Sequence, residues 1–274
     1  MMFTNKNYNI KRLRDHFDLA AGDDFVWASD ANSRKLMEEA CADPEVMFIE
    51  ADVCRSPLTG ELIMAEPPQR TSDLDFSTWM EMAIAASKIM KIDMKDSDIV
   101  SEVVDKCRQK IKAGQSILPI LLQADILHGP AGEDISEFDA VEFIEQAQKL
   151  GPDVVLSLGW TALDGAKGKP PYTKAMMDEM IDVIRNHVGH TSYTLCIRSN
   201  YVIDSIENIE YLMRELPEAH LTIWGHGRAS NMSPSDLQWT KDRLDPERVT
   251  YDLDEDRKES LIPKRDAPSS EFTI

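Results

Sequence analysis

The chain has 274 residues, 42% hydrophobic and 29% charged, the composition of an ordinary globular protein that can bury a sizeable core. Its 30 basic and 49 acidic residues give a net charge of −19, which argues against nucleic acid or an anionic membrane as the default partner. No apolar stretch approaches about 18 residues, so no transmembrane helix is predicted.

The N-terminal segment 1–14 is polar and basic and has no apolar centre, so it does not resemble a signal peptide. The sequence as it stands therefore predicts a cytoplasmic protein, or an extracellular one if a signal segment has been removed. The four cysteines have neither metal-type nor paired spacing, which favours reduced thiols. They are Cys41, Cys54, Cys107 and Cys196.

Eight times along the chain a short apolar run ends in polar residues, and most of these runs are followed by the apolar spacing of a helix. We predict strands at 25–28, 46–49, 89–92, 117–122, 154–158, 193–197, 221–224 and 249–253. We predict helices at 10–19, 34–41, 76–87, 99–111, 140–150, 174–187, 203–216 and 234–244. Eight such units predict a (β/α)8 TIM barrel, whose active site lies where the strands end.

The barrel is predicted to span 24–254, after a lead-in at 1–23 and before a charged tail at 255–274 that we expect to be disordered. A hairpin is expected at 56–67, and a flexible loop at 164–171. Residues 71–73 are expected to cap the helix at 76–87, and Gly151 to follow the one at 140–150. The helix after the last strand is weak or missing, so the pattern does not specify how the barrel closes.

Carboxylates gather at the ends of the second and third predicted strands. Glu50 and Asp52 are two apart, so in a strand they share one face, and Asp93 ends the next strand. Burying such charges requires a compensating cation. Three carboxylates from adjacent strands suit Mg²⁺, with Ca²⁺ as the alternative ion. The competing interpretation is a set of ion pairs and strand-end hydrogen bonds without metal.

Other strand-end residues are candidates for contacting a ligand. Lys91, Lys95 and Arg198 suit an anionic group such as phosphate, unless they only neutralise the carboxylates. Further candidates at strand ends are Gln123, Asp125, Trp160 and Trp224, although the two tryptophans also suit simple packing. His128 and His226 are the plausible histidines of the barrel mouth. No glycine-rich phosphate loop occurs.

Ordered fragments over nearly the whole predicted barrel resemble the menorin family of animal proteins. They include ANS (31–33), IEADV (49–53), KIDMK (91–95), ADILHGP (124–130), SLGWT (157–161) and LTIW (221–224). More distantly the family is similar to phospholipase-C-like phosphodiesterases, including glycerophosphodiester phosphodiesterases and sphingomyelinase D. This resemblance implies that Glu50, Asp52 and Asp93 hold Mg²⁺. It also matches Lys95 and Trp224 to a lysine and a tryptophan of those enzymes.

The chain departs from that pattern at two catalytic positions. The resemblance places histidines, acting as acid and base, where this chain has Ser29 and Glu66. A positioned acid or base typically contributes about 10²–10⁴-fold. Serine cannot titrate near neutrality, and Glu66 is an acid only if its neighbours raise its pKa.

The sequence therefore predicts a pseudoenzyme that binds a divalent cation together with a phosphate-containing ligand or a protein partner. For extracellular members, the resemblance implies a role in cell-surface complexes. The alternative is an active Mg²⁺-dependent phosphodiesterase in which His128 or His226 replaces the missing pair.

Overall fold

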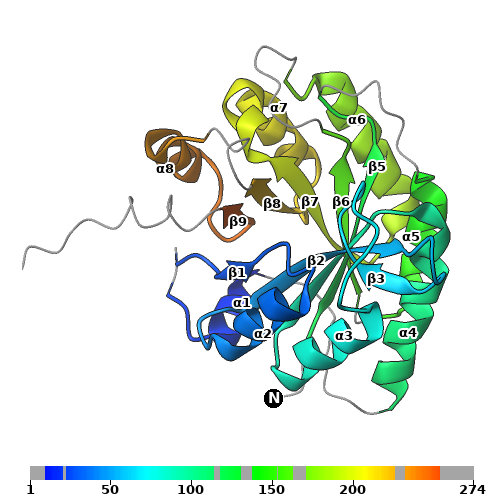
Figure 1. Ribbon diagram of the computed structural model, residues 1–274. Helices are drawn as coiled ribbons and strands as arrows, with labels where there is room; N and C mark the ends of the chain where they lie inside the picture. Colours follow the sequence, from blue (N-terminus) through cyan, green and yellow to red (C-terminus); the bar gives the residue numbers. More distant parts are fainter. Residues whose placement is uncertain are drawn as a thin grey trace, which may run out of the picture.

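Eight parallel strands form one sheet that curves into a nearly closed barrel (Figure 1). The computed structural model describes residues 10–20, 23–113, 118–130, 138–152, 154–162, 171–225 and 232–253. The strands, in sheet order, are β1 (Trp27–Ala28), β2 (Phe48–Arg55), β4 (Ile89–Met94), β5 (Ile120–Leu127), β6 (Val154–Trp160), β7 (Ser192–Arg198), β8 (His220–Gly225) and β9 (Val249–Leu253). The predicted TIM-barrel fold is confirmed.

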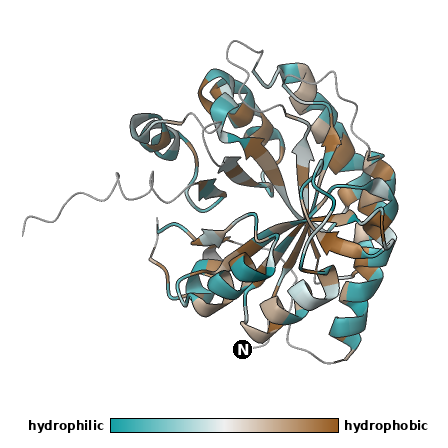
Figure 2. Ribbon diagram, viewed as in Figure 1, coloured by the Kyte–Doolittle hydropathy of each residue, from teal (hydrophilic) through white to brown (hydrophobic). Residues whose placement is uncertain are grey.

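Apart from α1, which precedes β1, the helices follow strands and form the outer layer. They are α1 (Ile10–His16), α2 (Arg34–Ala42), α3 (Phe76–Ala85), α4 (Val100–Lys112), α5 (Ala140–Gln148), α6 (Lys174–Val183), α7 (Val202–Glu215) and α8 (Pro234–Arg243). Figure 2 shows hydrophilic residues on the outer faces of these helices and hydrophobic residues along the strands. Within the part of the chain that the structure describes, none of the helices is long and apolar enough to cross a bilayer.

The predicted hairpin after the second strand is present. β3 (Leu62–Met64) pairs antiparallel with the end of β2, through contacts such as Val53 with Met64. The predicted cap of α3 was wrong in detail, because Asp75 rather than residues 71–73 accepts the hydrogen bond from the backbone N–H of Thr78. Asp73 instead accepts from the backbone N–H of Arg34, at 3.0 Å, and so satisfies the start of α2.

The strands that carry the candidate site are longer than predicted. β2 continues to Arg55 and β4 to Met94, and the two strands stay paired through Asp52 with Asp93. The prediction ended both strands too early because the apolar run stops where side chains become polar, while backbone pairing continues. Glu50, Asp52 and Asp93 therefore lie inside strands, on a rigid frame, rather than in the loops after them.

Side-chain alternation makes one end of the barrel apolar and the other polar. One hydrophobic cluster joins α1 to the first residues of several strands. It contains Ile10, Leu13, Phe25, Trp27, Phe48, Ile89, Leu121 and Val155. Residues two further along a strand share its face. On β2 and β4 these are Glu50 and Lys91, which begin the polar layer. The helix α1 thus closes the N-terminal end, and the polar groups collect at the C-terminal mouth.

The barrel closes through side chains rather than through a strand pair. Among the described residues, no ladder joins β1 to β9. Ser29 Oγ donates a hydrogen bond to Asp252 Oδ1 across this seam, at 2.8 Å. Lys241 Nζ lies 2.7 Å from Asp24 Oδ2 near the same seam. His226, the charged tail and nearly all of the predicted loop at 164–171 lie outside the described residues.

Candidate metal centre

Three carboxylates converge in the barrel mouth, as the sequence predicts. Glu50 and Asp52 of β2 and Asp93 of β4 each offer an oxygen, and these oxygens all lie within 4.8 Å of one another. Glu50 and Asp52 are buried, and Asp93 is half-buried. Three hard oxygen donors at this spacing match the ligand preference of Mg²⁺ or Ca²⁺.

The segment after β1 orients two of these carboxylates. The backbone N–H of Asp30 donates to Glu50 Oε2 at 2.9 Å. The Asn32 side chain donates to Asp52 Oδ2 at 2.6 Å, and its Oδ1 accepts from the backbone N–H of Asp52 at 2.8 Å. Asp30 has a φ of +55°, an uncommon value for a residue other than glycine, which turns the chain toward the cluster. Sequence reasoning did not select Asn32 as a site residue, although it lies in the fragment ANS.

A lysine ammonium lies among the carboxylates. Lys95 Nζ is 2.8 Å from Asp52 Oδ1 and 2.9 Å from Asp93 Oδ2. This is the arrangement of the alternative interpretation, in which Lys95 neutralises the carboxylates. Lys91, also predicted to contact a ligand, is buried beneath, 3.8 Å from Asp252 Oδ2 and over the Trp27 ring.

Even with two lysines present, the cluster is short of positive charge. Burial, assisted by Asp52, raises the pKa of Glu50 to about 8, although Lys91 opposes the rise. Burial and Asp52 also raise the pKa of Asp93, against the effect of Lys95. An added cation beside Glu50 and Asp93 would favour the ionised form of both carboxyls and so offset the effect of burial. The residues present therefore fit a divalent ion.

The predicted residues of β5 extend the polar layer. Gln123 Nε2 donates to Asp93 Oδ2 at 3.1 Å, and its Oε1 accepts from Ser157 Oγ and Cys196 Sγ, each at 3.2 Å. Burial raises the pKa of Asp125 to about 7, with a further rise from Asp93. Gln123 thus holds a ligand of the candidate site in place, while the Asp125 carboxyl lies within the electrostatic reach of Asp93.

Two strand-end aromatic residues have different environments. The Arg198 guanidinium lies over the half-buried Trp224 ring, 4.5 Å from its centroid, and Arg198 Nη1 donates to the carbonyl of Ala162 at 3.2 Å. Trp160, by contrast, is only 2% exposed and packs edge-on against Tyr172 within the hydrophobic core. The structure shows Trp160 packed in the core, which is the role that a tryptophan at a strand end more often has.

The two positions that depart from the catalytic pattern both lie near the cluster. Ser29 is hydrogen-bonded to Asp252, which itself faces Lys91. Partial burial raises the pKa of Glu66, and Asp52 raises it further, whereas Lys95 opposes the rise. Burial is thus the largest cause of the raised pKa of Glu66, and of the carboxylates in the cluster Asp52 and Asp93 contribute to it. His128 is exposed.

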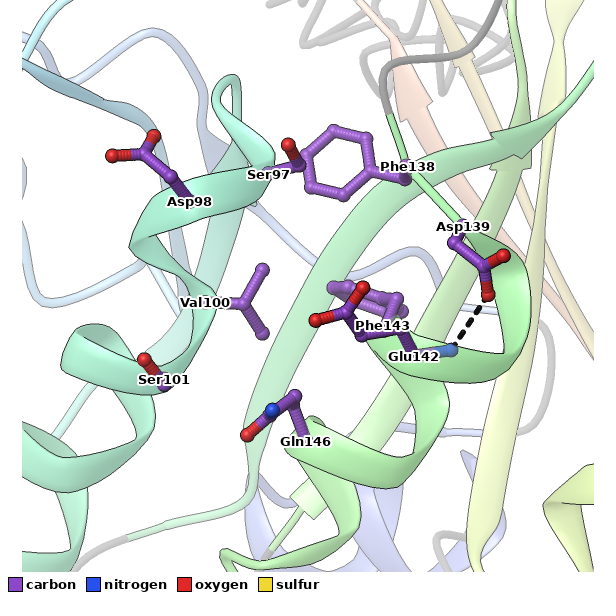
Figure 3. Close-up of a pocket in the computed structure, with 9 residues that line it drawn as sticks. All are labelled: Ser97, Asp98, Val100, Ser101, Phe138, Asp139, Glu142, Phe143 and Gln146. Atoms are coloured by element: carbon purple, nitrogen blue, oxygen red, sulfur yellow. Dashed lines mark hydrogen bonds between the residues drawn. The ribbon is translucent and has the colours of Figure 1, made fainter.

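A separate pocket of about 180 Å³ lies in the helix layer between α4 and α5 (Figure 3). Glu142 and Gln146 of α5 face Val100 of α4 across it, whereas Asp98 turns away and pairs with Arg55 at 3.0 Å. None of the residues that line this pocket belongs to the carboxylate cluster. The pocket is thus not part of the candidate metal centre.

Comparisons with known proteins show which family the chain belongs to. The menorin N-terminal domain family matches residues 22–258. The human protein FAM151B is 31% identical over 240 residues, which are 85% of this chain and 83% of that protein.

Among solved structures, the barrel is similar to a phosphodiesterase from Oleispira antarctica in complex with the product sn-glycerol-3-phosphate. The TM-score is 0.52 at 10% identity, over 86% of this chain and 96% of that one. A putative phosphonomutase from Burkholderia cenocepacia gives a TM-score of 0.48 at 11% identity, over 94% and 95% of the two chains. At such identities the likeness concerns the fold alone. The family match and the human relative, each covering most of the chain, show that the chain belongs to the menorin family.

Proposed function

We propose that this menorin-family barrel binds Mg²⁺, or alternatively Ca²⁺, through Glu50, Asp52 and Asp93, and that it has little or no phosphodiesterase activity. The observation that carries the proposal is the convergence of three carboxylate oxygens within 4.8 Å of one another, two of them on the buried side chains of Glu50 and Asp52. When bound, the cation would supply positive charge to an anionic group at the mouth.

The expected ligand carries a phosphate, and two cationic groups support this. Arg198 is stacked on Trp224, which holds the planar guanidinium in one orientation. Lys95 reaches the mouth beside the proposed cation, and its side chain is 23% exposed. A protein partner that presents a phosphorylated or acidic group is the other ligand class with this chemistry.

The loss of activity follows from the two positions that lack histidine. The Ser29 hydroxyl donates to Asp252 and has no basic nitrogen with which to accept a proton. Glu66 adds a carboxyl where a phosphodiester would approach. Each missing acid or base accounts for about 10²–10⁴-fold in rate.

An active Mg²⁺-dependent phosphodiesterase is the second candidate, and one observation favours it. The pKa of Asp125 is about 7, and that of Glu66 is raised, so carboxyl groups near the mouth could carry protons near neutrality. The product named for the Oleispira antarctica phosphodiesterase, sn-glycerol-3-phosphate, makes a glycerophosphodiester the first substrate to test. A lysophospholipid is the second.

Restoring the histidine pair tests both candidates. We expect the natural protein to be inert with Mg²⁺ on both substrates, and Ser29→His combined with Glu66→His to gain activity, because proton transfer is the missing component. Glu66→His also removes a charge that repels phosphate. Hydrolysis is measured for the natural protein, each single variant and the double variant.

Turnover of either substrate by the natural protein at about 1 s⁻¹ or faster would show that the protein is an active phosphodiesterase and not a pseudoenzyme. If the double variant folds and binds Mg²⁺ but stays inert, the pocket differs from an enzyme at more than these two residues. That result would leave the binding role and reject the explanation by the histidine pair.

A further inference from the structure

We infer that Lys95 is a tethered competitor of the divalent cation, and that a phosphate group relieves this competition, so that cation and anion bind cooperatively. The inference rests on the proposed cation site and concerns how occupation of that site is regulated. It assigns Lys95 a role in the metal-free protein as well as in the liganded one.

The first argument is the position of the ammonium. Lys95 Nζ lies 2.8 Å from Asp52 Oδ1 and 2.9 Å from Asp93 Oδ2, so it uses an oxygen of two of the three carboxylates that would hold the ion. The backbone around it is fixed, because the Lys95 N–H donates to the carbonyl of Val53 at 3.0 Å. Only the flexible side chain can therefore leave the carboxylates.

The second argument is charge. A cation bound to the same oxygens at about 2 Å would lie only ~4 Å from the ammonium, where two positive charges repel strongly in a buried site. Asp52 is further held by Asn32, and Asp93 by Gln123, so neither carboxylate turns freely toward the ion. Lys95 must then move away, or the cation binds weakly.

The third argument is that Lys95 can move and the other lysine cannot. The Lys91 side chain is 3% exposed and faces Asp252, also buried, beneath the cluster. The Lys95 side chain is 23% exposed at the edge of the mouth. An anion at the mouth would give the Lys95 ammonium a new partner. When the ammonium moves to this partner, two carboxylate oxygens become free for the ion. Because coupling between two sites is reciprocal, the cation must then also strengthen binding of the anion.

Calorimetric titration of Mg²⁺, with and without inorganic phosphate, tests this inference. We expect Lys95→Gln to bind Mg²⁺ about tenfold or more tightly than the natural protein in the absence of phosphate. Phosphate should tighten Mg²⁺ binding to the natural protein about five- to 150-fold, the usual range of coupling between sites. In Lys95→Gln it should tighten Mg²⁺ binding by a clearly smaller factor, because only the direct attraction between the cation and the phosphate remains.

Two further variants control for charge and for folding. Lys106→Gln on α4 removes the same charge from a lysine that contacts Ser77 and Glu102, so it should titrate like the natural protein. Lys95→Arg keeps the charge and should keep both the weak binding and the coupling. If Lys95→Gln does not fold without metal, the arginine variant carries the test. Tight, phosphate-independent binding by it would overturn the inference.

The outcomes separate the two proposals. If the natural protein binds Mg²⁺ and Lys95→Gln binds it no more tightly, the competition is refuted while the cation site stands. If neither protein binds Mg²⁺ with or without phosphate, the cation site itself is refuted, and the inference fails with it.

Discussion

At the scale of single residues, Gly159 provides the space that the Asp125 carboxyl occupies. The two residues are direct partners on β6 and β5. A Cβ atom on Gly159 would lie 2.2 Å from Asp125 Oδ1, which is too close for the two atoms to coexist. Glycine is therefore required here by a neighbouring side chain and not by backbone conformation.

Replacing Gly159 with alanine should destabilise the protein by about 1–3 kcal/mol, the usual cost of an added methyl group in a packed interior. Urea denaturation measures the loss. In an Asp125→Ala background the contacting oxygen is gone, so the same replacement should cost less. Equal costs in both backgrounds would mean that the carboxyl is not what excludes the methyl group.

At the scale of elements, α1 is a structural part of the barrel. Ile10 and Leu13 are 0% and 1% exposed, and they join the apolar layer formed by the starts of β2, β4, β5 and β6. The sequence predicted a helix here but placed it in a lead-in. Its role in closing the N-terminal end of the barrel could not be predicted. The contacts of α1 with these strands join residues more than thirty positions apart, and no local sequence pattern reveals them.

The replacement Leu13→Ala should lower the free energy of unfolding by about 2–5 kcal/mol, since it empties space beneath the barrel. Asp15→Ala, on the exposed side of the same helix, is the matched control and should change stability by less than about 0.5 kcal/mol. Both follow from urea unfolding curves. A Leu13→Ala variant as stable as the control would show that α1 does not brace the barrel.

The strands show which part of an element an apolar pattern predicts and which part it misses. Apolar runs located the eight parallel strands, because the inner and outer faces near the N-terminal end are both buried. They failed at the mouth, where the inward residues of β2 and β4 are polar although pairing continues through Asp52 and Asp93. The same polar residues that hid the strand ends were the ones that identified the candidate site.

At the scale of the whole molecule, the barrel is closed by a polar seam between β1 and β9. Ser29, Lys241 and their aspartate partners span it. The convergence of three carboxylates was predictable, because parallel strands bring their C-terminal ends to one face. The hydrogen bonds of Asn32 and the seam contact of Ser29 were not, because they depend on how the chain turns after a two-residue strand.

A divalent cation held by Glu50, Asp52 and Asp93 would stabilise the folded protein by mass action, and melting temperature measures this directly. With Mg²⁺ at about 100 times its dissociation constant, the stabilisation is about 2.7 kcal/mol. That corresponds to a rise of roughly 5–10 °C for a domain of this size. We expect this rise in the natural protein and in the surface control Asp43→Asn, and its loss in Asp52→Asn. An unchanged melting temperature at millimolar Mg²⁺ and Ca²⁺ in both the natural protein and Lys95→Gln, or an equal rise in Asp52→Asn, would contradict the cation site.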